Sequence, residues 1–186
     1  MDRADTLALP NRTFEAEYLE DTSLCRLILE HYDREHLSLR RYLSFLGVQQ
    51  ETAREIIQES FLKLHEHLLA GGDRSNLRAW LYRVAHNLAR NAQAAFDDSR
   101  TDSLTGSASV SDPVARTASA EEQLINEERI NRLRQAISKL SAPQKQCLSL
   151  RTQGLKYREI AEVLNVSTSA VAENVQRGLE RLKELV

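Results

Sequence analysis

Hydrophobic and polar residues follow one another along this chain with the period of α-helices. From residue 24 to residue 95, apolar residues recur three and four positions apart, the spacing that gives a helix one buried face. The pattern predicts two helices before Gly47, a third over 51–69 that stops at Gly71, and a fourth over 77–95 that Asn76 caps. The apolar faces of the first two helices are Leu24, Leu27, Ile28 and Tyr32, then Leu39, Tyr42, Leu43 and Leu46.

The same spacing continues in the last third of the chain. A charged helix is expected over 121–140. Its inner face would consist of Leu124, Ile130, Leu133 and Ile137. Ser141 suits an N-cap and Pro143 a first helical turn, so a further helix is expected over 144–152, closed by Gly154.

Residues 156–177, KYREIAEVLNVSTSAVAENVQR, have the spacing of a helix-turn-helix. One apolar face repeats on both sides of a break, where Asn165 suits a turn with positive φ and Ser167 can cap the second helix. The face consists of Tyr157, Ile160, Ala161, Leu164, Val171 and Val175. Such a motif places its second helix in the major groove of DNA. The pattern therefore predicts a nucleic-acid contact; the alternative is a helical hairpin packed for stability alone.

Residues 98–120 separate the two helical parts and consist mainly of Ser, Thr, Ala and Asp. A segment with so few large apolar residues cannot bury enough surface to order itself, which predicts a flexible linker. We therefore expect an N-terminal extension over 1–23, one helical domain over 24–97, and a second over 121–186. The predicted fold is all-α, with two small helical domains and the helix-turn-helix in the second.

Composition agrees with this fold and bears on location. Aromatic residues make up 5% of the chain, and its 6 Gly and 3 Pro leave room for long helices. No apolar run is long enough to cross a membrane, and the N-terminus is too polar for a signal peptide, so we expect a cytoplasmic protein without membrane insertion. Cys25 and Cys147 lie in apolar helical patterns, which predicts two buried, reduced thiols.

Charge is distributed unevenly along the chain, although the net charge is only −2. Residues 129–186 hold 11 Lys and Arg against 5 Asp and Glu, a net charge of +6, whereas 1–23 and 99–128 carry −4 each. Positive charge therefore gathers in the segment that contains the helix-turn-helix, where attraction to phosphate requires it. A basic solvated helix surface is the alternative.

The sequence contains none of the motifs that indicate an enzyme. Among the five histidines, no two lie three or four positions apart on a helix, as a metal pair would require. These histidines are His31, His36, His65, His67 and His86, and all are expected on the surface. A Gly-rich phosphate loop and a nucleophile elbow are also missing from the sequence. We therefore expect no catalytic residue, no metal site and no cofactor.

Three stretches together resemble one known family, the extracytoplasmic-function sigma factors of bacterial RNA polymerase. In the first domain, ETAREIIQESFLKLHEHL resembles that family's polymerase-binding helix, and SNLRAWLYRVAHNLARN resembles its promoter-melting helix. In the second, KLSAPQKQCLSLRTQGLKYREIAEVLNVSTSAVAENVQRGLERLKEL is similar to the domain that reads the minus-35 promoter element. The resemblance covers nearly the whole chain and implies a factor that directs core polymerase to specific promoters.

The resemblance also implies which residues touch polymerase and DNA. One helix face would lie against the coiled coil of the polymerase β′ subunit, and the β flap would be a second polymerase contact. The residues of that face are Glu55, Ile56, Gln58, Glu59, Phe61 and Leu62. For Phe61, core packing is the alternative. The DNA contacts implied at the melting helix are Arg78, Arg83, Asn87 and Arg90, beside a Trp80 that is expected to pack inside. Those in the helix-turn-helix are Lys156, Arg158, Ser167, Thr168, Ser169, Ala172, Glu173, Gln176 and Arg177.

The recognition helix departs from the family pattern. Ala172, Glu173 and Asn174 stand where the family usually has a basic run, and Leu179 replaces a common Arg. Fewer phosphate contacts weaken nonspecific binding and flatten its salt dependence, and Glu173 repels phosphate unless it accepts from a cytosine amino group. Two alternatives to a sigma factor follow: a sigma-like decoy that binds an anti-sigma factor, and a stand-alone helix-turn-helix regulator. An anti-sigma factor is also an expected partner of the sigma factor itself.

Overall fold

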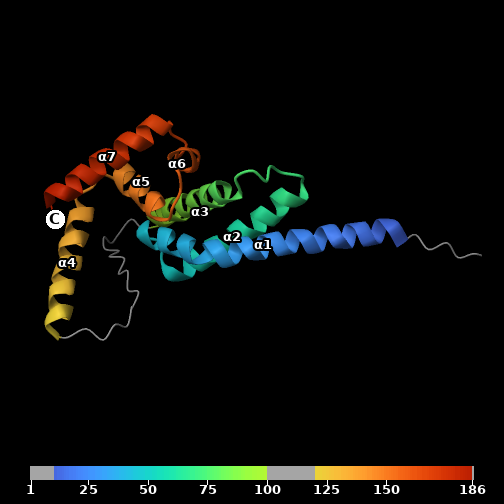
Figure 1. Ribbon diagram of the computed structural model, residues 1–186, viewed down its shortest axis with the longest axis horizontal. Coiled ribbons are helices and arrows are strands. Elements are labelled where there is room, and N and C mark those ends of the chain that lie inside the picture. Colours follow the sequence, from blue (N-terminus) through green and yellow to red (C-terminus); the bar gives the residue numbers. More distant parts are fainter. Residues whose placement is uncertain (1–10, 100–119, 186) are drawn as a thin grey trace, which may run out of the picture.

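The computed structural model describes residues 11–99 and 120–185 (Figure 1). In these two ranges the chain forms seven α-helices and no strand, which confirms the predicted all-α fold. The helices are α1 (Asn11–Phe45), α2 (Gln50–Leu69), α3 (Leu77–Ser99), α4 (Ala120–Ser138), α5 (Ala142–Thr152), α6 (Tyr157–Leu164) and α7 (Thr168–Leu185). Most of the predicted linker over 98–120 lies outside the described residues.

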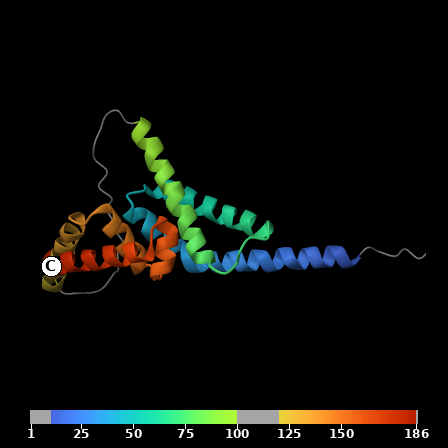
Figure 2. The same cartoon turned by 90° about the horizontal axis from the view of Figure 1, so that it is seen from above.

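Helix α1 is one continuous helix, where the apolar pattern predicts two (Figure 2). It begins at Asn11, so residues 11–23 of the predicted N-terminal extension are its first turns, which project beyond α2 and α3. The buried face runs unbroken from Leu24 through Glu35 to Leu39 and Tyr42. A charged residue at one of these inward positions interrupts the apolar pattern in the sequence but does not interrupt the helix.

Local signals place several helix ends where the sequence predicts them. Asn76 caps α3, because its Oδ1 accepts a 3.4 Å hydrogen bond from the backbone N–H of Ala79. Ser141 and Gln144 form a reciprocal capping box at the start of α5. Gly154 ends this helical segment with a φ of +89°, a left-handed conformation that glycine adopts without strain.

The helices pack in two groups around a buried apolar cluster. In the first, α1, α2 and α3 contact one another; in the second, α7 packs on α4, α5 and α6. The largest fully buried apolar side chains include Tyr42, Leu64 and Leu81 in the first group, and Leu150 and Ile160 in the second.

Three expectations about side-chain burial are wrong. Ile130 and Leu133 are exposed, because α4 turns Ala136 and Leu140 inward instead. Cys25 is exposed and only Cys147 is buried, since neighbouring positions on a helix point in different directions and Leu24 takes the inward one.

His86, expected on the surface, is buried in the first group of helices. Its Nδ1 and the hydroxyl of Tyr42 are joined by a 2.8 Å hydrogen bond, which satisfies both polar groups inside the apolar cluster. Burial lowers the pKa of His86, and the nearby charge of Arg90 lowers it further. Native His86 is therefore neutral at a pH at which an unfolded chain already binds a proton.

This difference predicts that acid destabilises the fold. The contribution of neutral His86 is fully present above about pH 6.5, the ordinary pKa of histidine, and is lost as the pH falls from there to the lowered native pKa. Urea unfolding measured between pH 7.5 and 5 checks it, with the His86→Phe variant as control. If the variant loses stability with acid as steeply as the native protein, His86 does not cause the effect.

Candidate nucleic-acid interface

Helices α6 and α7 form the predicted helix-turn-helix. Asn165 ends α6 in the left-handed conformation at φ 53°, and the Oγ of Ser167 accepts a 3.2 Å hydrogen bond from the backbone N–H of Ala170. The apolar residues that hold the two helices together, Ile160, Ala161, Val171 and Val175, are buried as predicted. Tyr157 differs: it is 38% exposed, and the guanidinium of Arg151 lies 5.5 Å from its ring.

The N-terminal half of α7 presents short polar side chains to solvent. Ser167, Thr168 and Ser169 are exposed around its first turn, and Glu173, Gln176 and Arg177 follow along the helix. Ala172 is half-buried. Lys156 and Arg158 are exposed at the start of α6. The structure therefore brings all nine residues expected in the helix-turn-helix into one region of the second group of helices.

Two of the cations in this region carry a carboxylate on the same helix. The Arg177 guanidinium lies 2.6 Å from the Glu173 carboxylate, and that of Arg158 lies 3.6 Å from the Glu162 carboxylate. Exposed ion pairs one helical turn apart are worth only about 0.5 kcal/mol, so a phosphate can replace either partner. The acidic substitution in the recognition helix thus reduces the positive charge that Arg177 presents to DNA.

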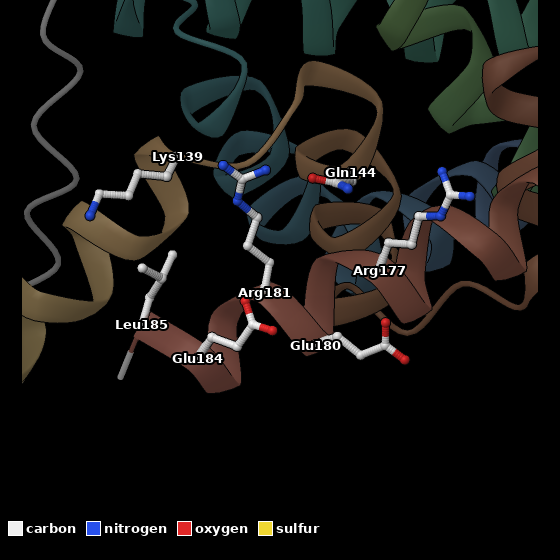
Figure 3. A pocket seen from close by; sticks show the side chains of 7 residues that line it. All are labelled: Lys139, Gln144, Arg177, Glu180, Arg181, Glu184 and Leu185. Carbon is white, nitrogen blue, oxygen red and sulfur yellow. The ribbon is translucent and has the colours of Figure 1, made fainter.

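A hollow of about 470 Å³ lies beside the recognition helix, between the end of α4, the start of α5 and the second half of α7 (Figure 3). Its cations are Lys139, Arg177 and Arg181, with Arg181 extending from α7 towards the gap between Lys139 and Gln144. Glu180 points away from that gap. The basic character of the second group is therefore continuous from the recognition helix to this hollow.

On α3, the residues expected to touch DNA fall into two sets. Arg83, Asn87 and Arg90 are exposed and share one face of the helix, because they lie four and three positions apart. Arg78 lies apart from them: its side chain is 32% exposed and forms an ion pair with the buried Glu35 of α1. Trp80 is half-buried and stacks on His67 at a ring distance of 4.7 Å, in agreement with a packing role.

On α2, the residues expected to touch polymerase divide in the same way. Glu55, Gln58 and Leu62 are exposed, and Glu59 is half-exposed in a 3.0 Å ion pair with Lys63. Ile56 and Phe61 are buried at 5% and 7% exposure. These two belong to the helix face that packs on α1 and α3, and the ring of Phe61 meets Tyr32 edge-on at 5.1 Å. For Phe61, the core alternative describes this structure.

In the described part of the chain, no three His, Cys, Asp or Glu side chains lie close enough to hold a metal ion. None of its helices is long and apolar enough to cross a bilayer.

Comparison with known proteins identifies the family. The description Sigma-70 region 2 matches residues 31–95, and Sigma-70, region 4 matches residues 130–182. The RNA polymerase sigma factor SigZ of Bacillus subtilis is 30% identical over 83% of this chain and 84% of its own length. This chain belongs to the sigma factors of bacterial RNA polymerase. It is of the extracytoplasmic-function type, like its relative SigW of Bacillus subtilis, which is 26% identical over 71% of this chain and 74% of that protein.

Solved sigma factors share the fold. RpoE of Bartonella quintana, in complex with the anti-sigma factor NepR, aligns with a TM-score of 0.61 at 22% identity over 84% of this chain and 94% of that chain. CnrH, in complex with the cytosolic domain of CnrY, aligns with a TM-score of 0.56 at 18% identity over 89% and 88%. Region 2 of this sigma factor thus lies within α1–α3, and region 4 within α4–α7.

The sequence gives no direct indication of the polar contacts between the two regions. Asn76 donates a 3.0 Å hydrogen bond to the carboxylate of Glu162, and Arg78 donates to the backbone carbonyl of Gln153. The one available signal is Glu35, an acidic residue at an inward position of α1 that requires a cationic partner.

Proposed function

We propose that this sigma factor docks on core polymerase through the exposed face of α2, places α3 at the minus-10 element, and reads the minus-35 element with α6 and α7. The observation that supports this division most strongly is the helix-turn-helix geometry of α6 and α7 in the same chain as region 2. In this proposal the protein performs no catalytic step of its own and acts in the cytoplasm, where polymerase and promoter DNA are.

The proposed contacts follow the exposed side chains. On α2 they are Glu55, Gln58, Glu59 and Leu62, which can meet the β′ coiled coil without unfolding the helix. Arg83, Asn87 and Arg90 of α3 are free to meet a separated strand, since Arg residues hold phosphates and flat polar side chains meet unstacked bases. Region 4 would meet the β flap.

An anti-sigma factor is a further proposed partner. The similar structures of RpoE and CnrH each contain a second protein bound to the sigma factor, named as an anti-sigma factor for RpoE. A decoy that only sequesters such a partner would keep this fold and lack promoter activity. Transcription by core polymerase, with and without the protein, therefore tests the proposal and separates it from the decoy.

The ion pair on the recognition helix predicts opposite effects for its two residues. Arg177→Ala should weaken binding to promoter duplex and lower the slope of log affinity against log salt by about one. Glu173→Gln should strengthen binding at low salt, because it frees Arg177 and removes a charge that repels phosphate. Fluorescence anisotropy at several salt concentrations measures both.

Glu128→Gln is the matched control, since it opens the Arg132–Glu128 ion pair of the same type on α4. It should leave the slope unchanged. If Glu173→Gln weakens binding to the promoter but not to other sequences, Glu173 reads a base and does not merely screen Arg177.

A further inference from the structure

Regions 2 and 4 are in direct contact in this structure. Helix α3 packs on α6, and α1 touches α5, so one apolar cluster continues through both regions (Figure 1). The contact therefore joins the helix proposed for the minus-10 element to the first helix of the unit proposed for the minus-35 element.

Arg78 lies at the centre of this contact. Its Nε donates a 3.1 Å hydrogen bond to Glu35, its Nη2 donates to the backbone carbonyl of Gln153, and its guanidinium lies 5.9 Å from the ring centroid of Tyr82. Glu35 is only 3% exposed, which leaves Arg78 as the cation that offsets this buried carboxylate. Arg78 thus links α1 and α3 to the turn that precedes α6.

A second polar link lies one helical turn away. The Nδ2 of Asn76 donates to Glu162 of α6, whose other carboxylate oxygen lies 3.6 Å from the Arg158 guanidinium. Glu162 is therefore shared between region 2 and a cation proposed to touch DNA. Close approach is also built into the turn, because a Cβ on Gly154 would lie 3.6 Å from the Arg78 guanidinium.

This arrangement is incompatible with a promoter bound at both elements. The minus-10 and minus-35 elements are separated by about 25 base pairs, or about 85 Å of duplex at about 3.4 Å per base pair. Helices α3 and α6 cannot contact each other and also reach both elements of such a duplex, which is stiff over this length. Arg78, engaged by Glu35 and Gln153, also has few donors left for phosphate.

We propose that the contact between α3 and α6 is an autoinhibitory closed state, latched by Arg78 on Gln153 and by Asn76 on Glu162. The inference rests on the proposed function. Promoter recognition requires the latch to open, and docking on core polymerase supplies the free energy by binding the open state better. Residues 100–119 connect the regions, and a segment of that length can span at most about 70 Å, so the chain permits a large separation.

A cross-link that holds the latch closed tests this inference. The variant carries Asn76→Cys and Glu162→Cys, with Cys25→Ser to remove the exposed native thiol, and a short bismaleimide joins the new cysteines; Cys147 is buried. We expect the linked protein to keep its helical content and melting temperature but to lose promoter-dependent transcription at least tenfold relative to the unlinked variant. The control links Glu128→Cys to Arg132→Cys within α4 and should keep full activity.

A distance measurement on the same two cysteines separates this inference from the proposed function. Spin labels at positions 76 and 162 should report a short distance in the free protein and one several-fold longer when it is bound to core polymerase. A distance that stays short in the complex, or a cross-linked protein that transcribes as well as the unlinked one, overturns the closed state. If the labels separate but even the unlinked protein yields no transcript, the proposed function fails while the closed state stands.

Discussion

Replacing Leu62 by Glu should weaken binding to core RNA polymerase by about 30-fold and leave thermal unfolding unchanged. Leu62 is 53% exposed on α2, so its substitution creates no cavity in the fold. A large apolar side chain at the centre of an interface is typically worth about 2 kcal/mol or more, which corresponds to about 30-fold in affinity. Titration of core polymerase against the fluorescently labelled sigma factor measures the change.

Leu69→Glu is the matched control for this prediction. Leu69 lies on the same helix and is 61% exposed, but it is outside the face proposed to meet polymerase. It should bind polymerase as the native protein does. Equal losses in both variants would mean that added negative charge weakens binding, and a loss in neither would exclude this face of α2 from the interface.

Arg78→Met should destabilise the protein by about 2 kcal/mol. Methionine retains most of the side-chain volume but leaves the Glu35 carboxylate buried without its cation, which typically costs about 3–5 kcal/mol for a fully buried pair. The expected loss is smaller because the Arg78 side chain is 32% exposed. Urea unfolding followed by circular dichroism measures it.

Two further variants decide the cause of that loss. Adding Glu35→Gln to Arg78→Met should restore more than half of the stability, since the unpaired charge is gone. Arg40→Met removes the same charge from an exposed position of α1 and should change stability by less than about 0.5 kcal/mol. If Arg78→Met is no more destabilising than Arg40→Met, the Arg78–Glu35 pair does not support the fold.

Features set by local chemistry could be predicted from the sequence. Asn165 in the left-handed turn, the Ser141 and Ser167 caps, and the buried valines of α7 depend on residues within a few positions of one another. The recognition helix with its exposed polar residues could be predicted for the same reason. Family resemblance extended this local reading to both sigma regions, and the family matches confirm it.

Features set by packing could not be predicted in this way. Phe61 and Leu62 are adjacent apolar residues, and only the position of α1 and α3 decides that Phe61 is buried and Leu62 is exposed. Ile130 and Leu133 have the spacing of an inner helix face, yet α4 turns this face away from α7. Arg78 and Gln153 lie 75 positions apart in the chain, so their contact follows from the arrangement of the two regions.

The most direct test of the central claim is transcription by purified core polymerase from a library of genomic fragments, with and without this protein. Sequenced transcripts should begin at a defined set of start sites only when the protein is present, and those sites should share upstream elements at the minus-10 and minus-35 positions. Leu62→Glu should reduce all of them together, whereas Arg177→Ala should reduce most those with the weakest minus-35 element. A transcript pattern that is the same with and without the protein would contradict its assignment as a working sigma factor.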